Sequence, residues 1–279
     1  MSDPRKHVMT IMLRGCPIRL AWSLWEGTGE KPTWLFIHGM GSSRWAFADL
    51  LERQPVPGQY VAIDLPGFGD SDLPAFVQTL EDFREAVHQF IQGLNCQHPI
   101  LVGHSFGGMV AGDVVRVHSD EVGGLVLVAS AGYFFPHNAM KASPWPWLNQ
   151  IGIWLTSLDF YGNRILRALG VEPLGLPGDT RKRMRHGWRR AREMARMREF
   201  YQAPDFIDHL AHSAVPTVSI HGDRDILFPL PLVRDAVGMA FPVLVQHGAG
   251  HLPYDYDLEA FIPLLQQAYQ FISPRMEER

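Results

Sequence analysis

Short apolar runs alternate with helical patterns along the first part of the chain. Four of these runs are four to six residues long, and their length and near-continuous hydrophobicity predict strands buried on both faces of a parallel sheet. They cover residues 33–37, 60–64, 100–103 and 124–129. Two earlier runs, at 8–14 and 18–25, predict a pair of strands that form a hairpin.

Between the predicted strands, apolar residues recur at helical spacing. Thr79 has the character of an N-cap, with Asp82 three residues later, and apolar side chains then recur at helical spacing as far as Leu94. Further helices are predicted over 109–117 and 258–271. Repeated alternation of strand and helix predicts an α/β fold with a mostly parallel sheet between two layers of helices.

The alternation is interrupted in the middle of the chain. Residues 134–210 contain no buried strand pattern and are rich in Trp, Pro and Arg, whereas strand patterns resume at 216–221 and 242–246. We therefore predict one α/β core, formed by residues 1–133 and 211–279, with residues 134–210 inserted as a helical cap.

Composition and charge narrow the range of functions. Hydrophobic residues make up 46% of the chain and the net charge is -4, so a globular core is expected and no general basic field for nucleic acid. Cys16 and Cys96 form neither a metal motif nor a disulfide framework, which favours a reducing, cytoplasmic location. The apolar stretch near Met1 is too short for a signal-peptide core, and no segment predicts a membrane span.

The pentapeptide GHSFG at 103–107 matches the motif G-x-S-x-G. It follows a predicted buried strand and precedes a predicted helix, which is the arrangement that a nucleophile elbow requires. Small residues on both sides leave room for the strained turn that exposes the serine. The alternative is a plain glycine-rich turn, but this context makes Ser105 the candidate nucleophile.

A nucleophilic serine needs a base and a group that orients the base. His251, in a glycine-rich loop after the last predicted strand, is the candidate base, whereas His247 at the strand end is expected to be structural. Two acids follow the preceding strand. Asp225 is favoured over Asp223, because the chain must turn before a side chain can face the histidine. Asp223 is expected to be a turn residue paired with Arg224.

Backbone N–H groups are expected to stabilise the oxyanion that forms during acyl transfer. One donor should be the amide of Phe106, the residue after the nucleophile. The other should come from the loop HGMGSS at 38–43, with the amide of Met40 as the candidate.

Five motifs together resemble the α/β-hydrolase family in its lidded serine hydrolase branch. They are HGMGSS, DLPGFGDSD, GHSFGG, GDRD and GAGH, in the order and spacing of that family. The resemblance implies an α/β-hydrolase fold with about eight strands, a helical cap, and a cofactor-free Ser-His-Asp triad. It also implies that Asp64 belongs to a shaped loop near the site, and we interpret Asp64 as structural. Ser105 at the elbow disfavours the branches that carry Asp there, the epoxide hydrolases and haloalkane dehalogenases.

The predicted reaction is hydrolysis of a carboxylic ester, thioester or lactone through an acyl-enzyme. Transfer of the same acyl group to an alcohol or amine, carbon–carbon bond hydrolysis and peptide hydrolysis remain alternatives. A non-catalytic ligand-binding protein is a further alternative. Three triad residues argue against it, because ligand binding alone does not require them.

The predicted cap suggests what the enzyme binds. Residues 180–201 carry nine basic side chains against two acidic ones. This pattern is typical of a solvated helix face, and a sharper hypothesis is an anionic substrate group or an acidic carrier protein. A hydrophobic pocket for a small-molecule ester is expected to be covered by Trp145, Trp147 and Trp154. His247 and His251 are four residues apart, but the Gly-Ala-Gly between them does not form a helix that would align them. His209 and His212 are expected to be surface groups, so we predict no metal and no cofactor.

Overall fold

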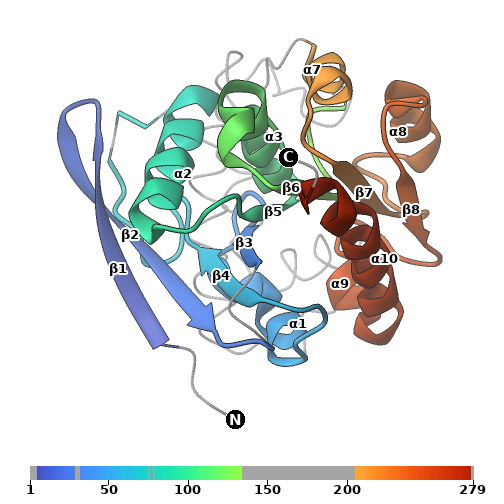
Figure 1. Cartoon of the computed structure of the whole chain (residues 1–279), viewed down its shortest axis with the longest axis horizontal. Helices are drawn as coiled ribbons and strands as arrows, with labels where there is room; N and C mark the ends of the chain where they lie inside the picture. Colours follow the sequence, from blue (N-terminus) through green and yellow to red (C-terminus); the bar gives the residue numbers. More distant parts are fainter. Residues whose placement is uncertain (1–4, 29–31, 75, 78, 134–204, 278–279) are drawn as a thin grey trace, which may run out of the picture.

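An eight-stranded sheet runs through the centre of the chain, with helices on both of its faces (Figure 1). The computed structural model describes residues 5–28, 32–74, 76–77, 79–133 and 205–277. The strand order is β1-β2-β4-β3-β5-β6-β7-β8. β1 and β2 form an antiparallel hairpin, β2 pairs antiparallel with β4, and the remaining pairs are parallel. The expected mostly parallel sheet of about eight strands is confirmed.

Each predicted strand is present to within a few residues. The strands are β1 (Arg5–Leu13), β2 (Cys16–Trp25), β3 (Thr33–Ile37), β4 (Gln59–Ile63), β5 (Ile100–His104), β6 (Gly124–Val128), β7 (Thr217–Gly222) and β8 (Val243–Gln246). The helices are η1 (Arg44–Phe47), α1 (Ala48–Glu52), α2 (Leu80–Leu94), α3 (Phe106–His118), η2 (Ser119–Glu121), α7 (Phe206–His212), α8 (Leu230–Val237), α9 (Pro253–Tyr256) and α10 (Leu258–Glu277).

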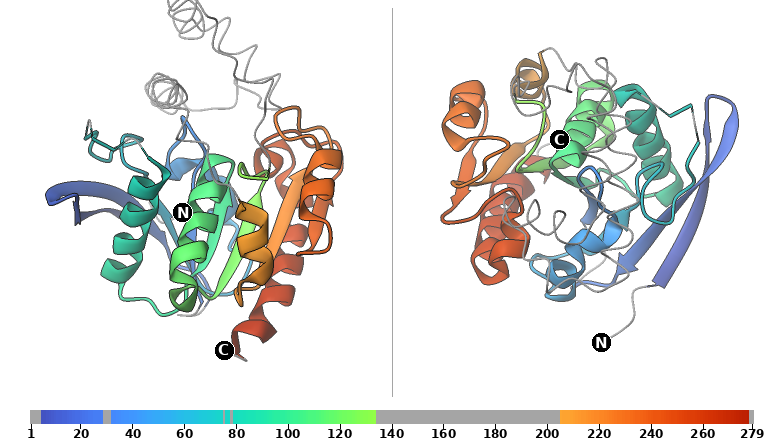
Figure 2. Two further views of the ribbon diagram at one scale, coloured as in Figure 1. Left: turned by 90° about the horizontal axis from the view of Figure 1, so that it is seen from above. Right: turned by 180° about the vertical axis from the view of Figure 1, so that it is seen from behind.

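Alternate side chains of the sheet build two separate hydrophobic layers. In β3, Leu35 and Ile37 pack in the layer that includes α2 and α3, whereas Trp34 and Phe36 pack in the layer that includes α1 and α10. All four side chains are fully buried. Figure 2 shows the two helical layers on opposite sides of the sheet. This period-two burial on both faces explains why the parallel strands read as continuous apolar runs.

Helix ends follow local capping chemistry where the sequence supplies it. The Thr79 hydroxyl accepts from the Asp82 amide at 3.2 Å and the Asp82 carboxylate accepts from the Thr79 amide at 3.0 Å, a complete capping box. α10 continues beyond the predicted end at Phe271, because Ile272 and Met276 still pack in the hydrophobic layer that includes α1 and α10. The short helices α1, α8 and α9 were not predicted from the sequence, and α8 buries Leu230, Val233 and Val237 along one face.

The carboxyl end of the predicted cap packs on the core. Phe206, the first residue of α7, is 4% exposed, and a Cβ on Gly112 of α3 would lie 2.3 Å from its ring. Residues 134–204, most of the predicted cap, lie outside the described residues. Among the helices of the described ranges, none combines the length and hydrophobicity needed to cross a bilayer.

Candidate active site

Ser105 occupies a strained turn between β5 and α3. Its backbone angles are φ 52 and ψ -118, a conformation that a residue with a side chain rarely adopts. The Ser105 amide donates to the Val128 carbonyl at 3.0 Å, and the Ser105 carbonyl accepts from the Ala131 amide at 2.9 Å. The end of β6 therefore holds the turn in place from both sides of the serine.

Glycines flank Ser105 because no side chain fits beside the turn. A Cβ on Gly103 would lie 2.5 Å from the Gly107 carbonyl oxygen, and a Cβ on Gly107 would lie 2.2 Å from the Ile37 carbonyl oxygen. Both distances are shorter than any real contact of a Cβ atom. The motif that identified Ser105 in the sequence is thus a steric requirement of this elbow.

The structure brings Ser105, His251 and Asp225 together from three separate loops. His251 Nε2 lies 3.0 Å from Ser105 Oγ, and His251 Nδ1 lies 2.9 Å from Asp225 Oδ2. His251 is 5% exposed and Asp225 is 4% exposed. Gly222, at the end of β7, makes this approach possible, because a Cβ there would meet the Ala249 carbonyl oxygen of the histidine loop at 2.3 Å.

Asp225 is arranged to remain ionised beside the imidazole. Burial by itself raises the pKa of this carboxyl, but the hydrogen bond and charge of His251 and the Phe228 amide lower it, and the net pKa falls below the usual value. Asp225 Oδ1 accepts from the amides of Leu227 and Phe228 at 2.8 and 3.0 Å. A second buried histidine, His221, lies 3.5 Å from Asp225 Oδ2.

The two rival residues of the sequence analysis pair with each other at the surface. His247 Nδ1 lies 2.9 Å from Asp223 Oδ2, and the Gly248 amide donates to Asp223 Oδ1 at 2.7 Å. The turn points the Asp223 carboxylate toward the loop after β8, so its hydrogen-bond partners are His247 and Gly248, and Arg224, the partner expected from the sequence, acts on it through its charge. The hydrogen bond from His247 is the main cause that lowers the pKa of Asp223.

His104, the second residue of the elbow motif, holds the backbone of the loop that carries His251. Its Nε2–H donates to the His251 carbonyl at 2.9 Å, and the two rings lie 4.9 Å apart. Burial, and then the charge of His251, lower the pKa of His104 to about 3, so its imidazole is neutral. This role of His104 was not predicted from the sequence, although a histidine at a variable position of the motif could have indicated it.

His38 fixes the loop that carries the candidate oxyanion donor. Its Nδ1–H donates to the Gly39 carbonyl at 2.7 Å, while its Nε2 accepts from the Leu65 amide at 3.1 Å. Both bonds require the neutral imidazole, and burial lowers the pKa of His38. A Cβ on Gly39 would lie 3.2 Å from Ser105 Cβ, so the segment that leads into Met40 lies directly against the serine.

A buried ion pair supports the same loop from the other side. Asp64 accepts from the Arg44 amide at 2.5 Å and also pairs with the Arg44 guanidinium, which reaches Asp70 at 2.8 Å. The Asp64 and Arg44 side chains are 0% and 1% exposed. Asp64 therefore ties the loop after β3 to the loop after β4, in keeping with a structural role, but its partner Arg44 was not anticipated.

The residues predicted to contact the substrate belong to the predicted cap. Trp145, Trp147, Trp154 and the basic run at 180–201 lie outside the described residues. A groove of about 910 Å³ does occur in the described part of the chain, but Thr33 and Gln59 in its lining place it at the amino ends of β3 and β4. It therefore lies at the opposite end of the sheet from Ser105.

Sequence comparisons relate the chain to known enzymes. A family model described as "Alpha/beta hydrolase family" matches residues 34–264. The chain is 24% identical over 246 residues to the pimeloyl-[acyl-carrier protein] methyl ester esterase of Vibrio vulnificus (strain CMCP6), and this match covers 85% of the chain and 94% of the relative. It is 30% identical over 158 residues to a probable 1-acylglycerol-3-phosphate O-acyltransferase of Oryza sativa subsp. japonica. That second match covers 53% of the chain but only 38% of the relative.

Solved structures share the fold at low sequence identity. A crystal structure of the N-acyl homoserine lactonase AidH with N-hexanoyl homoserine has a TM-score of 0.76 at 20% identity, covering 97% of this chain and 98% of that one. An esterase from Thermogutta terrifontis has a TM-score of 0.72 at 21% identity, covering 97% and 99%. These similarities confirm the fold that the sequence motifs predicted.

Proposed function

The chain belongs to the alpha/beta hydrolase family, and from this premise we propose that it is a serine hydrolase that cleaves carboxylic esters through an acyl-enzyme. One observation carries the proposal: a single buried imidazole, that of His251, lies 3.0 Å from a serine hydroxyl and 2.9 Å from a carboxylate. This is the geometry in which a base can remove a proton while an acid stabilises the resulting charge.

The reaction begins when Ser105 Oγ bonds to the ester carbonyl carbon. The hydroxyl proton moves to His251 Nε2, and Asp225 stabilises the imidazolium from Nδ1. The tetrahedral intermediate expels the alkoxide, which takes the proton from Nε2 and leaves as the alcohol. Water then loses a proton to His251 and attacks the acyl-serine, and Ser105 recovers its proton as the carboxylic acid is released.

The negative oxygen of each tetrahedral intermediate requires donors that are already in place. We assign this role to the amides of Phe106 and Met40. Phe106 begins α3, and the loop before Met40 is held by His38 and by the Asp64–Arg44 pair. Each such donor typically lowers the barrier by about 2.7–4 kcal/mol.

One of the relatives helps to define the substrate class. The Vibrio relative is named as an esterase for a methyl ester carried on an acyl-carrier protein, and it aligns with most of this chain. A small-molecule ester with a hydrophobic or anionic acyl group is therefore the proposed substrate. An acidic carrier protein at the basic run 180–201 is a narrower proposal, tested by comparing the carrier-bound ester with the free methyl ester.

The deciding experiment is labelling with a fluorophosphonate, followed by peptide mapping. The expected adduct is on Ser105 and disappears in Ser105→Ala, whereas Ser273→Ala, which removes a partly buried serine of α10, retains it. A panel of esters of increasing acyl length then defines the substrate range. A folded protein that forms no adduct on Ser105 would overturn the proposed function.

Acyl transfer is the second candidate, because the rice relative is named as an acyltransferase. The same acyl-enzyme would pass its acyl group to an alcohol acceptor in place of water. Product ratios measured with and without a lysophospholipid acceptor separate the two reactions, since only a transferase converts the added acceptor into acylated product.

A further inference from the structure

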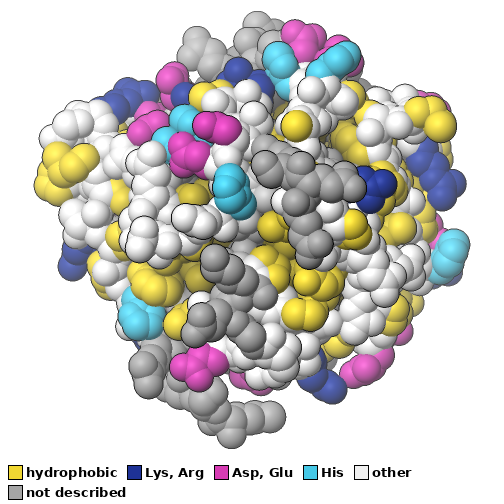
Figure 3. Space-filling view, in the orientation of Figure 1, with side chains coloured by type: hydrophobic (Ala, Val, Ile, Leu, Met, Phe, Trp, Pro, Cys, Tyr) yellow, Lys and Arg dark blue, Asp and Glu magenta, His cyan; other side chains and the backbone are white. Residues whose placement is uncertain are grey.

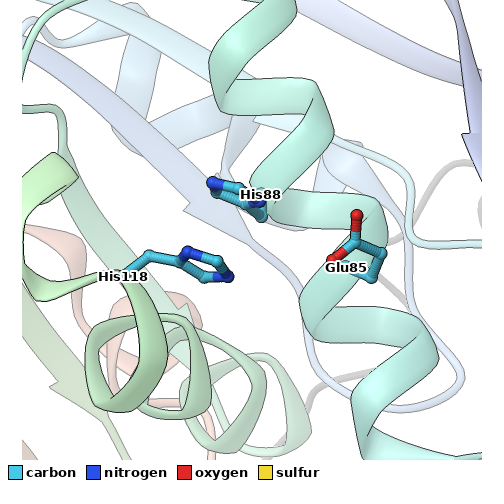
Figure 4. Close-up of side chains that lie close together, drawn as sticks. All are labelled: Glu85, His88 and His118. Atoms are coloured by element: carbon cyan, nitrogen blue, oxygen red, sulfur yellow. The ribbon is translucent and has the colours of Figure 1, made fainter.

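A second cluster of titratable side chains lies between α2 and α3, away from the triad. Glu85, His88 and His118 each offer one potential ligand atom, and these atoms lie within 4.8 Å of one another. The rings of His88 and His118 are stacked, with centroids 3.5 Å apart, and Glu85 lies one helical turn before His88 (Figure 4). Figure 3 shows histidine and acidic side chains next to one another over α2 and α3.

The hydrogen bonds of the His88 ring favour one tautomer of the neutral imidazole. Its Nε2 lies 3.0 and 3.1 Å from the two carboxylate oxygens of Glu121. A carboxylate only accepts, so in the neutral ring Nε2 carries the hydrogen and Nδ1 keeps its lone pair. Gln92 Nε2 lies 3.2 Å from the same nitrogen, and this contact fits the tautomer once the Gln92 amide nitrogen and oxygen exchange positions.

The lone pair of His88 Nδ1 is buried without a partner. His88 is 8% exposed, and its Nδ1 has no hydrogen bond among the described residues. A buried acceptor in this state carries a desolvation cost. A cation or a donor at Nδ1 would remove that cost.

Hydrogen bonds from neighbouring side chains to the potential ligands resemble those that support the ligands of metal sites. A metal-bound histidine typically donates its other ring N–H to a carboxylate, as His88 does to Glu121. Glu85 Oε1 accepts from Gln89 at 2.6 Å, and the Gln89 amide is itself held by the backbone of Met12 in β1.

We propose that Glu85, His88 and His118 bind a divalent transition-metal ion, for which Zn²⁺ is the best match. Two imidazole nitrogens and one carboxylate oxygen, with water as the fourth ligand, form a set that zinc prefers. Magnesium and calcium favour sites made only of oxygen ligands. Binding would draw the ligand atoms closer than 4.8 Å, which requires the stacked rings to slide apart by side-chain rotation.

The position of the cluster indicates a structural role. His118 ends α3, whereas Ser105 immediately precedes its first residue, so the length of the helix separates the cluster from the nucleophile. A bound ion would join the carboxyl end of α3 to the middle of α2. Because the ion would bind the folded chain, zinc at a hundred times its dissociation constant would shift the unfolding equilibrium about 100-fold.

The test uses the full chain, treated with EDTA and titrated with ZnCl₂ by calorimetry. We expect one zinc per chain, and at least tenfold weaker binding in Glu85→Gln and in His118→Gln, both at partly exposed positions. His209→Gln, an exposed histidine of α7, is the matched control and should bind as the wild type does. Zinc should raise the melting temperature of the wild type and the control but not of the other two variants.

Several results would overturn the proposal. Unchanged stoichiometry and affinity in both Glu85→Gln and His118→Gln would place the zinc elsewhere. Loss of binding in His247→Gln would assign it to the surface pair with Asp223. Absence of saturable binding would exclude the site. A native circular dichroism spectrum for each variant separates a lost ligand from a lost fold.

Discussion

Two histidine–aspartate pairs lie close together beyond the carboxyl ends of β7 and β8, and they make an instructive comparison. Asp223 and Asp225 are two residues apart in the sequence. Asp223 pairs with His247 and Asp225 with His251, and each pair has an Nδ1–Oδ2 distance of 2.9 Å. The side chains of His251 and Asp225 are 6% and 0% exposed, whereas those of His247 and Asp223 are 86% and 30% exposed.

The two pairs share the same contact but differ in their surroundings. His251 has a hydroxyl at 3.0 Å from its other ring nitrogen, and its backbone is held by His104. His247 has no second hydrogen-bond partner among the described residues. In water a charge pair of this kind is weak, whereas burial strengthens the electrostatic interaction between Asp225 and a protonated His251.

The largest expected difference is between His251→Ala and His247→Ala. Removing the base leaves Ser105 without a proton acceptor, and kcat should fall by on the order of 10⁴–10⁶-fold. His247→Ala should leave kcat close to the wild-type value. Steady-state hydrolysis of a chromogenic ester measures both, and comparable losses in the two variants would contradict the assignment of His251.

Replacing Asp225 should lower kcat far more than replacing Asp223, by a difference nearly as large as that between the two histidines. In Asp225→Asn the new amide can donate to Nδ1 and so favour the wrong tautomer of His251, and kcat should fall by about 10⁴-fold. Asp223→Asn is the matched control on the exposed pair, where the same change should leave kcat nearly unaltered. A large loss of kcat in Asp223→Asn with a small loss in Asp225→Asn would reverse the choice made from the sequence.

The sequence was sufficient to predict much of the architecture. Strands buried on both faces give continuous apolar runs, and the elbow glycines are fixed by backbone contacts such as that between Gly107 and Ile37. The choice of Asp225 also followed from local geometry, because the chain turns at Asp223 and Arg224 directly before it. The structure places Asp225 against His251, and its catalytic role stays a prediction.

Supporting contacts were harder to predict, because they join residues that are distant along the chain. His104 holds the backbone of His251 across 147 positions. Arg44 is charged, so the sequence alone predicts an exposed position, and its burial is explained only by the ion pair with Asp64. The expectation of no metal rested on the cysteines and on histidines close together in the sequence, whereas His88 and His118 meet through the packing of α2 on α3.

Acid stability should separate buried from exposed histidines. The pKa of His104 is about 3 in the folded chain and 6.5 when unperturbed, so between these values only the unfolded chain takes up the proton. Stability is therefore lost as the pH falls from 6.5 toward 3, by up to about 1.4 kcal/mol per pH unit. Burial lowers the pKa of His38 and His221 as well, and adds to the same trend.

The variant His104→Gln tests this origin, since glutamine can keep the hydrogen bond to the His251 carbonyl but does not titrate. Urea unfolding at pH 7 and pH 4.5 should show a smaller loss of stability for His104→Gln than for the wild type, by roughly 1–3 kcal/mol. His247→Gln, at the exposed pair, should show the wild-type loss. Equal losses in all three proteins would rule out His104 as a source of the acid sensitivity.

The smallest effects are expected from the exposed pair itself. His247→Ala removes a solvated ion pair, which is typically worth about 0–1 kcal/mol of unfolding free energy and weakens further with salt. Asp223→Ala should cost more, because Asp223 Oδ1 also accepts from the Gly248 amide at 2.7 Å and so anchors the loop that leads to His251. Urea unfolding at low and high salt orders the two variants. A salt-independent loss in His247→Ala that equals the loss in Asp223→Ala would mean that the surface histidine, and not the carboxylate, positions that loop.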